Sequence, residues 1–183
     1  GGLVTPELRE VTVLFADLVG FTSLAENLPP AELAQVLNDY FTRMAEVIFK
    51  YDGTLDKYIG DAIMAVFGAP LTLENHGLAA VMAASEMRRA LAKFNADHAG
   101  RPPLRTRIGI NSGRVVAGEI GSPNKREYTV LGDTVNIASR LESSVAKPGM
   151  VVIGPLTQQT VKDHFRCRSL GTLPLKGKQR QVE

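Results

Sequence analysis

The sequence predicts an α+β fold in which helices pack against a largely antiparallel sheet. Segments with strand-like and helical apolar patterns are mixed along the chain and do not alternate regularly. Two short segments that suit strands, 54–59 and 62–67, are separated only by Gly60-Asp61, which suits a two-residue hairpin turn. Because a tight hairpin joins antiparallel neighbours, these observations disfavour a doubly wound parallel sheet. The length of 183 residues suits a single domain over residues 1–183.

The first third of the chain predicts a buried strand followed by a long amphipathic helix. Residues 11–15 are mostly β-branched or aromatic and indicate a buried strand that ends at Asp17. Pro29-Pro30 is expected to open the helix, and Asp52-Gly53 is expected to end it. The apolar residues of this helix recur every three or four positions, as a single buried face requires: Leu33, Val36, Leu37, Tyr40, Phe41, Met44, Val47 and Ile48.

The remainder of the chain predicts further helices and short strands. We expect Ser112-Gly113 to form a turn between two strands, and Asp133 to act as the N-cap of a helix. In order, the expected elements are a helix over about 74–97, strands at 105–111 and 114–119, a strand at 127–131, a helix over about 134–145, a strand at 150–153, a short helix after Pro155 and a pair of strands near 165–175.

The composition argues against several classes of protein. A net charge of +2 gives no support for nucleic-acid binding, which usually needs a concentrated basic surface. The single Cys167 cannot form an internal disulfide and suits a reducing, cytoplasmic compartment. No apolar run approaches the ~20 residues that span a bilayer, and no signal peptide opens the chain. Gly1-Gly2 suggests a domain cut from a longer protein, in which sensor or membrane domains can lie elsewhere.

Two aspartates are candidates for a metal site. Asp17 follows an apolar strand and Asp61 lies in the hairpin turn, so the two carboxylates converge if the strand lies beside the hairpin. Mg²⁺ is commonly held by one or two carboxylates, with substrate phosphates and water completing its shell. From the residues alone, the alternative stays open that Asp17 caps a helix and Asp61 is merely a turn residue.

Three further polar residues suit a nucleotide site. Asn136 and Arg140 are four residues apart on a predicted helix and therefore point in the same direction. Arg offers a planar set of donors for phosphate oxygens, and Asn can contact a sugar. Lys57 lies in the first strand of the hairpin. Each of these residues could equally be a solvated surface position. The P-loop motif is absent from the sequence, which disfavours a P-loop enzyme.

Three segments, 15–22, 57–61 and 128–140, together resemble the catalytic domain of class III adenylyl and guanylyl cyclases. They read Phe-Ala-Asp-Leu-Val-Gly-Phe-Thr, Lys-Tyr-Ile-Gly-Asp and Tyr-Thr-Val-Leu-Gly-Asp-Thr-Val-Asn-Ile-Ala-Ser-Arg. Their order and spacing match from about residue 9 to about residue 178. The resemblance implies a ferredoxin-like βαββαβ core with additional strands and helices on a mostly antiparallel sheet.

The resemblance also implies roles for the matching positions. Asp17 and Asp61 correspond to aspartates that bind two divalent metal ions, Mg²⁺ or Mn²⁺, with the backbone carbonyl of Leu18 as a further ligand. It implies two catalytic positions, Asn136 to orient the ribose and Arg140 to stabilise charge on the reacting phosphorus. The substrate-binding positions that it implies are Lys57 and Thr129 for the base, Lys176 for the terminal phosphates, and Leu18, Phe21 and Thr22 in the first segment.

The base-reading pair distinguishes this chain from many members of that family. Thr129 stands where many of them carry an aspartate, so the chain resembles the bacterial-type adenylyl cyclases with Thr or Ser there. Lys57 and Thr129 suit adenine better than guanine, which makes ATP the expected substrate. The resemblance further implies a homodimer whose active sites are shared between the two chains.

Three alternatives remain open. The first is a guanylyl cyclase. The second is another two-metal nucleotide enzyme on a ferredoxin-like core, such as a polymerase palm or a cyclic-dinucleotide synthase, which Asn136 and Arg140 at helical spacing disfavour. The third is a catalytically silent domain that binds nucleotide or only dimerises. Such a domain would be expected to lack a metal aspartate or Arg140, and this chain lacks neither.

Overall fold

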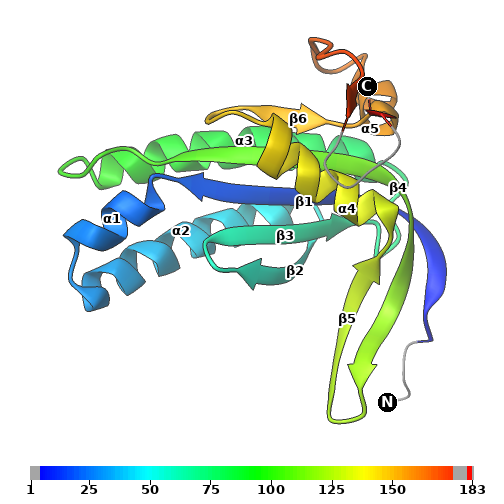
Figure 1. Cartoon of the computed structure of the whole chain (residues 1–183), viewed down its shortest axis with the longest axis horizontal. Helices are drawn as coiled ribbons and strands as arrows, with labels where there is room; N and C mark the ends of the chain where they lie inside the picture. The colour runs from blue at the N-terminus through cyan, green and yellow to red at the C-terminus, as the bar shows by residue number, and fades with distance from the viewer. Residues whose placement is uncertain (1–4, 175–180, 183) are drawn as a thin grey trace.

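A single curved sheet organises the molecule (Figure 1). The computed structural model describes residues 5–174 and 181–182. Five strands of the sheet follow the order β2-β3-β1-β4-β5, and β6 joins as the sixth by pairing with β4. All of these pairs are antiparallel except β4 with β6. The expected α+β class with a mostly antiparallel sheet is therefore confirmed.

Each face of the sheet buries its own apolar cluster. Strand β1 (Glu7–Val19) shows the alternation directly, because Leu14 and Ala16 join one cluster while Val13 and Phe15 join the other. Helices α2 (Pro30–Lys50) and α3 (His76–Asp97) cover the first face. Helix α4 (Asp133–Arg140) covers the second face through Ala138. The sheet is thus the middle layer between helices of unequal extent.

Helix α2 confirms the amphipathic pattern read from the sequence. It begins with Pro30 in its first turn, where the missing N–H costs no helical hydrogen bond. Its buried residues all belong to the predicted apolar face: Val36, Tyr40, Met44, Val47 and Ile48. Glu32 in the first turn and Lys50 in the last turn complement the helix dipole. The chain then turns at Asp52, which has a positive φ of 61°.

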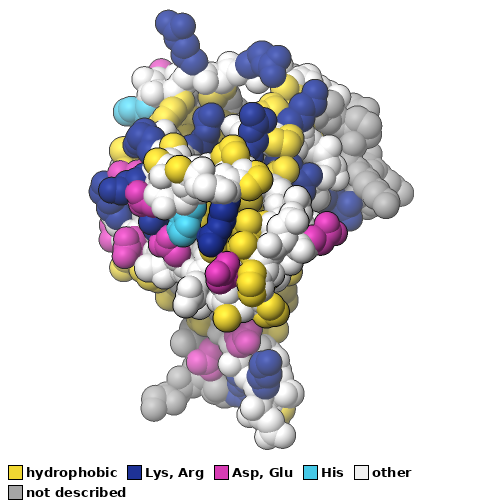
Figure 2. Space-filling model, turned by 90° about the vertical axis from the view of Figure 1, so that its left-hand side faces the viewer, with side chains coloured by type: hydrophobic (Ala, Val, Ile, Leu, Met, Phe, Trp, Pro, Cys, Tyr) yellow, Lys and Arg dark blue, Asp and Glu magenta, His cyan; other side chains and the backbone are white. Residues whose placement is uncertain are grey.

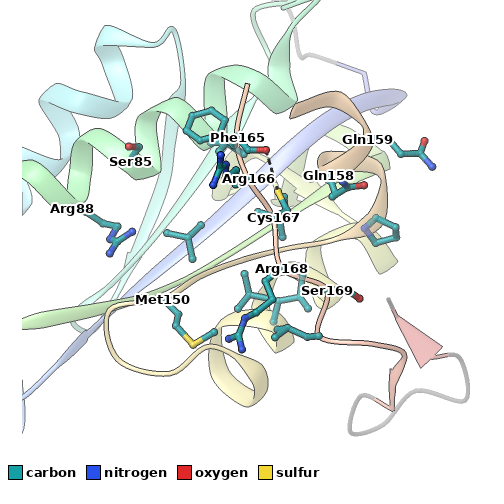
Figure 3. A pocket seen from close by; sticks show the side chains of 17 residues that line it. Ser85, Arg88, Met150, Gln158, Gln159, Phe165, Arg166, Cys167, Arg168 and Ser169 are labelled. Carbon is teal, nitrogen blue, oxygen red and sulfur yellow. Dashed lines mark hydrogen bonds between the residues drawn. The ribbon is translucent and has the colours of Figure 1, made fainter. Parts of the chain in front are cut away.

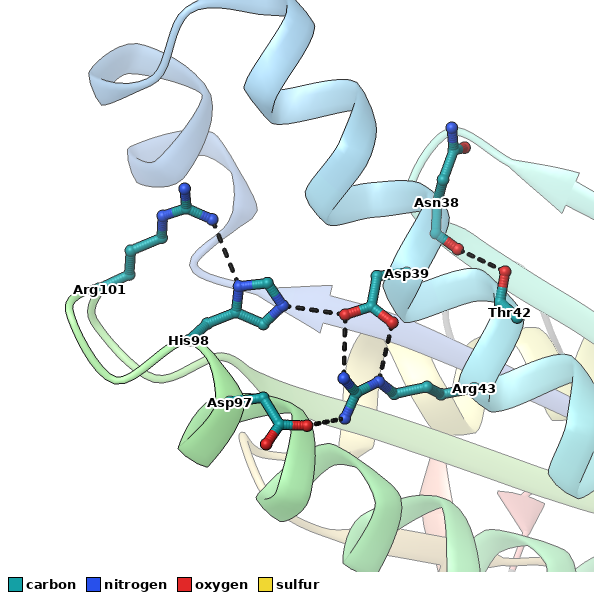
Figure 4. A network of polar contacts seen from close by, with 7 residues as sticks. All are labelled: Asn38, Asp39, Thr42, Arg43, Asp97, His98 and Arg101. Atoms are coloured by element: carbon teal, nitrogen blue, oxygen red, sulfur yellow. Dashed lines mark hydrogen bonds and ion pairs between the residues drawn. The ribbon is translucent and has the colours of Figure 1, made fainter.

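A charged network joins α2 to the end of α3 (Figure 4). The guanidinium of Arg43 donates two hydrogen bonds to Asp39, at 2.9 and 3.1 Å, and also pairs with Asp97 at 2.9 Å. His98 Nε2 lies 2.9 Å from Asp39 Oδ2. The hydrogen bond from Arg43 is the main cause that lowers the pKa of Asp39. These contacts fix the two helices against each other on the outer side of the first layer.

The expected hairpin is also present. Strand β2 (Thr54–Ile59) pairs antiparallel with β3 (Ala62–Phe67), and β3 pairs with β1. Before the hairpin, the short helix α1 (Phe21–Asn27) follows β1 directly. Helix α3 begins within two residues of the expected start and ends at the expected residue.

The turn expected at Ser112-Gly113 is wrong. Strand β4 (Arg105–Ser122) runs through both residues without interruption and pairs with β1 along 13 residues of that strand. The Ser112 hydroxyl lies 2.7 Å from the hydroxyls of Thr12 and of Thr157. Thr12 in turn lies 2.7 Å from His76 Nδ1. Ser112 is therefore a buried member of a hydroxyl chain, and partners distant in sequence override its preference for turns.

Three differences concern the C-terminal third. Strand β5 (Lys125–Leu131) is as expected, but Gly132 occupies the N-cap position, so that Asp133 lies in the first turn of α4. The expected single helix to Val145 is instead α4 followed by one π-helical turn, η1 (Leu141–Val145). After β6 (Val151–Ile153) and α5 (Pro155–Val161), the last strand pair is β7 (Leu173–Pro174) with β8 (Gln181–Val182). Residues 165–172 are not strand.

No helix among the described residues combines the length and apolar character needed to cross a membrane.

Candidate functional site

Asp17 and Asp61 lie at the same end of the sheet. Asp17 is near the end of β1, and its neighbour Ala16 pairs with Ile63 of β3. Asp61 lies in the turn between β2 and β3, where Gly60 adopts a left-handed φ of 62° that a side chain would disfavour. Figure 1 shows this turn and the end of β1 on the left-hand side of the molecule. The antiparallel register therefore brings together two carboxylates that are far apart in sequence.

The environment of these carboxylates opposes two negative charges. Burial raises the pKa of Asp61, and the charge of Asp17 raises it further. The same two charges, after burial itself, raise the pKa of the fully buried Tyr40 phenol. The Tyr40 hydroxyl has no hydrogen-bond partner among the described residues. A divalent cation would relieve this repulsion, so the acidic pair fits such an ion.

Arg107 supplies positive charge at this site. It stands opposite Asp17 in the pairing of β1 with β4, and its Nη2 donates to Asp17 Oδ2 at 3.2 Å. The same nitrogen lies 3.3 Å from Glu142 Oε1. Its Nε is buried and makes no hydrogen bond to the described residues. Arg107 was not among the residues singled out from the sequence, because an arginine in a strand resembles an ordinary exposed position.

Glu142 is the second residue that the sequence did not point to. It lies in η1 and is buried. Its position depends on Gly109 of β4, because a Cβ there would collide with the backbone nitrogen of Glu142. Burial, followed by the charge of Asp17, raises the pKa of Glu142 to about 7. The only signal in the sequence was an acid beside the apolar Leu141, within a helix that packs on the sheet.

Asp17 and Asp61 make a small ligand set. The described residues contain no group of three or more His, Cys, Asp or Glu arranged to hold a metal ion. Two carboxylates can nevertheless bind Mg²⁺ when substrate phosphates and water complete its shell. Leu18, whose carbonyl is the further expected ligand, is buried beside Asp17 on β1. Phe21 and Thr22 follow in the first turn of α1, with Phe21 half-buried and Thr22 exposed.

Lys57 and Thr129 come from opposite ends of the strand order. Thr129 lies on β5 and Lys57 on β2, yet the curvature of the sheet brings these strands together. The Thr129 hydroxyl donates a hydrogen bond of 2.6 Å to Asp56, the residue next to Lys57. The two expected base-reading residues therefore lie close to each other within one chain.

Asn136 and Arg140 occupy the outer face of α4. Asn136 is exposed and Arg140 is half-buried, while Ala138 turns toward the sheet. Within the described residues, no hydrogen bond or ion pair joins either side chain, or Lys57, to Asp17 or Asp61. The expected site residues thus form separate groups in a single chain. Lys176 lies outside the described residues.

A cavity of about 610 Å³ lies elsewhere, between α3, β6, α5 and residues 165–170. Figure 3 shows Phe165, Met150 and Arg88 among the side chains that line it. None of the expected site residues that the structure describes borders this cavity. Figure 2 views the end of the molecule that carries the aspartates. On this surface, charged side chains of both signs are scattered among hydrophobic ones.

Comparison with known proteins identifies a family whose sequence pattern matches this chain. The model of the adenylate and guanylate cyclase catalytic domain matches residues 3–183. Adenylate cyclase 1 of Rhizobium meliloti is 37% identical over 174 residues, which are 93% of this chain. The chain spans only 26% of the length of that relative.

Two solved structures share the fold closely. The adenylyl cyclase CyaB from P. aeruginosa superposes with a TM-score of 0.93 at 36% identity, over 97% of this chain and 93% of that one. The guanylyl cyclase Cya2 superposes with a TM-score of 0.90 at 39% identity, over 97% of this chain and 90% of that one. The similarity therefore includes enzymes of both base specificities.

Proposed function

Because this chain belongs to the family of adenylate and guanylate cyclase catalytic domains, we propose that it converts ATP to 3′,5′-cyclic AMP and pyrophosphate. The observation that carries the proposal is the convergence of Asp17 and Asp61 at one end of the sheet. In this reaction the ribose 3′ oxygen attacks the α-phosphorus and loses its proton. The bond from the α-phosphorus to the bridging oxygen breaks, and pyrophosphate leaves with the bonding electrons.

Asp17, Asp61 and the carbonyl of Leu18 are the groups that would hold two divalent cations, Mg²⁺ or Mn²⁺. When bound, such ions lower the pKa of an attacking hydroxyl and neutralise phosphate charge. The chain's own contribution is the acidic pair and its surroundings. The two carboxylates are partly buried on the sheet, and Arg107 balances the negative charge of Asp17 before substrate arrives.

The other groups would orient the substrate. Arg140 would contact the α-phosphoryl oxygens, where a fixed cation stabilises charge that develops in the transition state. Asn136 would orient the ribose, and Lys176 would bind the terminal phosphates. Lys57 and Thr129 would contact the adenine ring. Support for this arrangement comes from the outward-facing polar side of α4 and from the proximity of β2 and β5.

The separation of these groups supports a homodimer. In one chain, neither Arg140 nor Asn136 contacts the acidic pair among the described residues. Exposed apolar side chains lie near both groups, with Ile59 and Leu131 each 51% exposed. A two-fold interface repeats every contact, so it would create two equivalent sites. Each site would combine Asp17 and Asp61 of one protomer with Lys57, Thr129, Asn136, Arg140 and Lys176 of its partner.

The proposed activity is tested by incubating the purified chain with ATP and Mn²⁺ or Mg²⁺ and separating the products by chromatography. Cyclic AMP and pyrophosphate are expected in equal amounts. D17N and D61N should each lose nearly all turnover while keeping the far-UV and near-UV circular dichroism of the wild type. D163N removes an exposed carboxylate just after α5 and serves as the matched control. Wild-type protein that forms no cyclic AMP would overturn the proposal.

Guanylyl cyclase activity is the second candidate, because a guanylyl cyclase is 39% identical to this chain and closely similar in structure. The same assay with GTP decides between them. Preferential formation of cyclic AMP supports the adenylyl assignment, and preferential formation of cyclic GMP replaces it.

A further inference from the structure

A hydrogen bond between Thr129 and Asp56 joins β5 to β2, the strands at the two ends of the sheet order. Thr129 Oγ1 donates to Asp56 Oδ2 at 2.6 Å, across 73 residues of sequence. A threonine hydroxyl carries one hydrogen and two acceptor positions. Because the hydrogen is already used, the hydroxyl can offer only acceptor positions to anything else that approaches it.

Asp56 lies at a break in the regular pairing of β2 with β3. Leu55 pairs with Ala65 and Lys57 pairs with Met64, which are adjacent residues of β3. Asp56 is therefore an extra residue in β2, a bulge that redirects its side chain. Thr129 is buried and Asp56 is only partly accessible, so water competes little with the contact.

The carboxylate of Asp56 is incompletely satisfied. Its Oδ1 is buried and has no hydrogen-bond partner among the described residues. Burial raises the pKa of Asp56, and the hydrogen bond from Thr129 opposes that increase. A buried acceptor that lacks a partner is unfavourable for folding. A local cost of this kind is expected where a residue serves binding more than stability.

We propose that Asp56 is a specificity-determining residue that acts through Thr129, by fixing the Thr129 hydroxyl as a hydrogen-bond acceptor toward the nucleotide base. This inference rests on the proposed function for its choice of ligand. An acceptor at this place matches the 6-amino group of adenine, which donates. It opposes the 6-carbonyl of guanine, which accepts. Asp56 thereby removes the ambiguity that a threonine alone leaves, since a free hydroxyl could donate to guanine.

The test compares wild type with D56N, T129V and the double variant, using ATP, GTP and purine riboside triphosphate. The last nucleotide has no substituent at position 6. In D56N the amide can donate to Thr129, which frees the hydroxyl to donate outward. The preference for ATP over GTP in kcat/KM should fall about tenfold. The kcat/KM for purine riboside triphosphate should stay within about twofold of the wild-type value, because its base has no substituent at position 6 to contact the Thr129 hydroxyl.

Non-additivity provides a second readout. If Asp56 acts through the Thr129 hydroxyl, D56N should change nothing further in a T129V background. E127Q is the matched control, since Glu127 is an exposed acid two residues from Thr129 whose charge also reaches Asp56. It removes a neighbouring charge without removing the hydrogen bond, and should leave the ATP to GTP ratio unchanged.

Binding measurements separate failure of this inference from failure of the proposed function. Dissociation constants for 3′-deoxy-ATP and 3′-deoxy-GTP are measured by calorimetry, because these nucleotides cannot cyclise. A wild type that makes no cyclic AMP but whose binding preference falls in D56N would overturn the function alone. An unchanged preference in folded D56N overturns the inference alone, as would an equal loss for all three triphosphates. A wild type that binds neither analogue overturns both.

Discussion

Arg107 stands directly opposite Asp17 in the pairing of β4 with β1, and its guanidinium donates to the Asp17 carboxylate at 3.2 Å. It also lies 3.3 Å from Glu142, so a single cation separates two carboxyl groups that would otherwise repel each other. The arginine is 30% exposed, which leaves it partly screened by solvent. Arg107 therefore offsets the repulsion between these carboxyl groups when no cation is bound.

The first prediction follows from that position. R107M removes the cation while keeping an apolar stem, and should destabilise the chain by about 1–3 kcal/mol in metal-free buffer. Addition of Mg²⁺ should recover part of this loss, because an ion at Asp17 and Asp61 replaces the missing charge. Thermal unfolding with and without Mg²⁺ measures both effects.

R105M is the matched control for R107M. Arg105 lies two residues earlier on the same strand and is exposed. It should change stability by less than about 0.5 kcal/mol, with no response to Mg²⁺ beyond that of the wild type. Equal destabilisation by the two variants would contradict a role for Arg107 at the acidic site.

The second prediction concerns Glu142, whose pKa is raised to about 7 by burial and by Asp17. An acid with a raised pKa in the folded state stays protonated there while the unfolded state ionises. Stability is therefore lost as pH rises from about 4.5 toward about 7. E142Q mimics the protonated form and should be more stable than wild type at pH 8 by about 1–3 kcal/mol, with little difference at pH 4.

Urea unfolding of wild type and E142Q across this pH range, in the presence of a chelator, measures the predicted difference. E74Q, which neutralises an exposed glutamate before α3, is the control and should track the wild type at every pH. A difference between E142Q and wild type that does not change with pH would show that Glu142 ionises alike in both states.

The third prediction concerns the buried hydroxyl chain. His76 Nδ1 lies 2.7 Å from Thr12, and burial lowers the pKa of His76 below 6.5. The unfolded state then binds a proton that the folded state does not, so stability falls as pH falls below about 6.5. H76Q should lose this part of the pH dependence, which is at most about 1.4 kcal/mol per pH unit.

Unfolding curves for wild type and H76Q between pH 5 and pH 8 test this assignment. H164Q replaces an exposed histidine and is the control. If both variants retain the same pH dependence as the wild type, another group is responsible for the loss of stability in acid.

The fold was predictable where its signals are local. The predictions of helix α2 and of the hairpin at Gly60 were correct, because helical periodicity and turn length depend on residues that are close together in the sequence. The continuous strand β4 was missed because Ser112 is kept in the strand by Thr12, which is 100 residues away. A propensity for turns carries little weight against pairing along a whole strand.

The same distinction between local signals and distant contacts applies to the residues of the candidate site. Asp17 stood out because an acid is unusual at the end of an apolar strand, and Asp61 stood out because a strand beside the hairpin would bring it close to Asp17. Arg107, Glu142 and Asp56 did not stand out, since each has ordinary chemistry for its predicted element. Their importance arises from tertiary contacts: Asp56 meets Thr129 only because the sheet curves until its end strands approach.

The last prediction is that two inactive chains can restore activity together. If each site combines Asp17 of one protomer with Arg140 of the other, D17N and R140A should each be nearly inactive alone. In a mixed dimer both defects fall in one site, and the other site is intact. With free exchange about half of the dimers are mixed, each with one working site of two, so activity should recover to about a quarter of the wild type. The control mixes D17N with D61N, whose defects lie in the same half of the site and leave no site intact. Exchange is verified by energy transfer between labelled chains. Mixtures that exchange without recovering activity would show either that each chain builds its own site or that the two sites of a dimer cannot act independently.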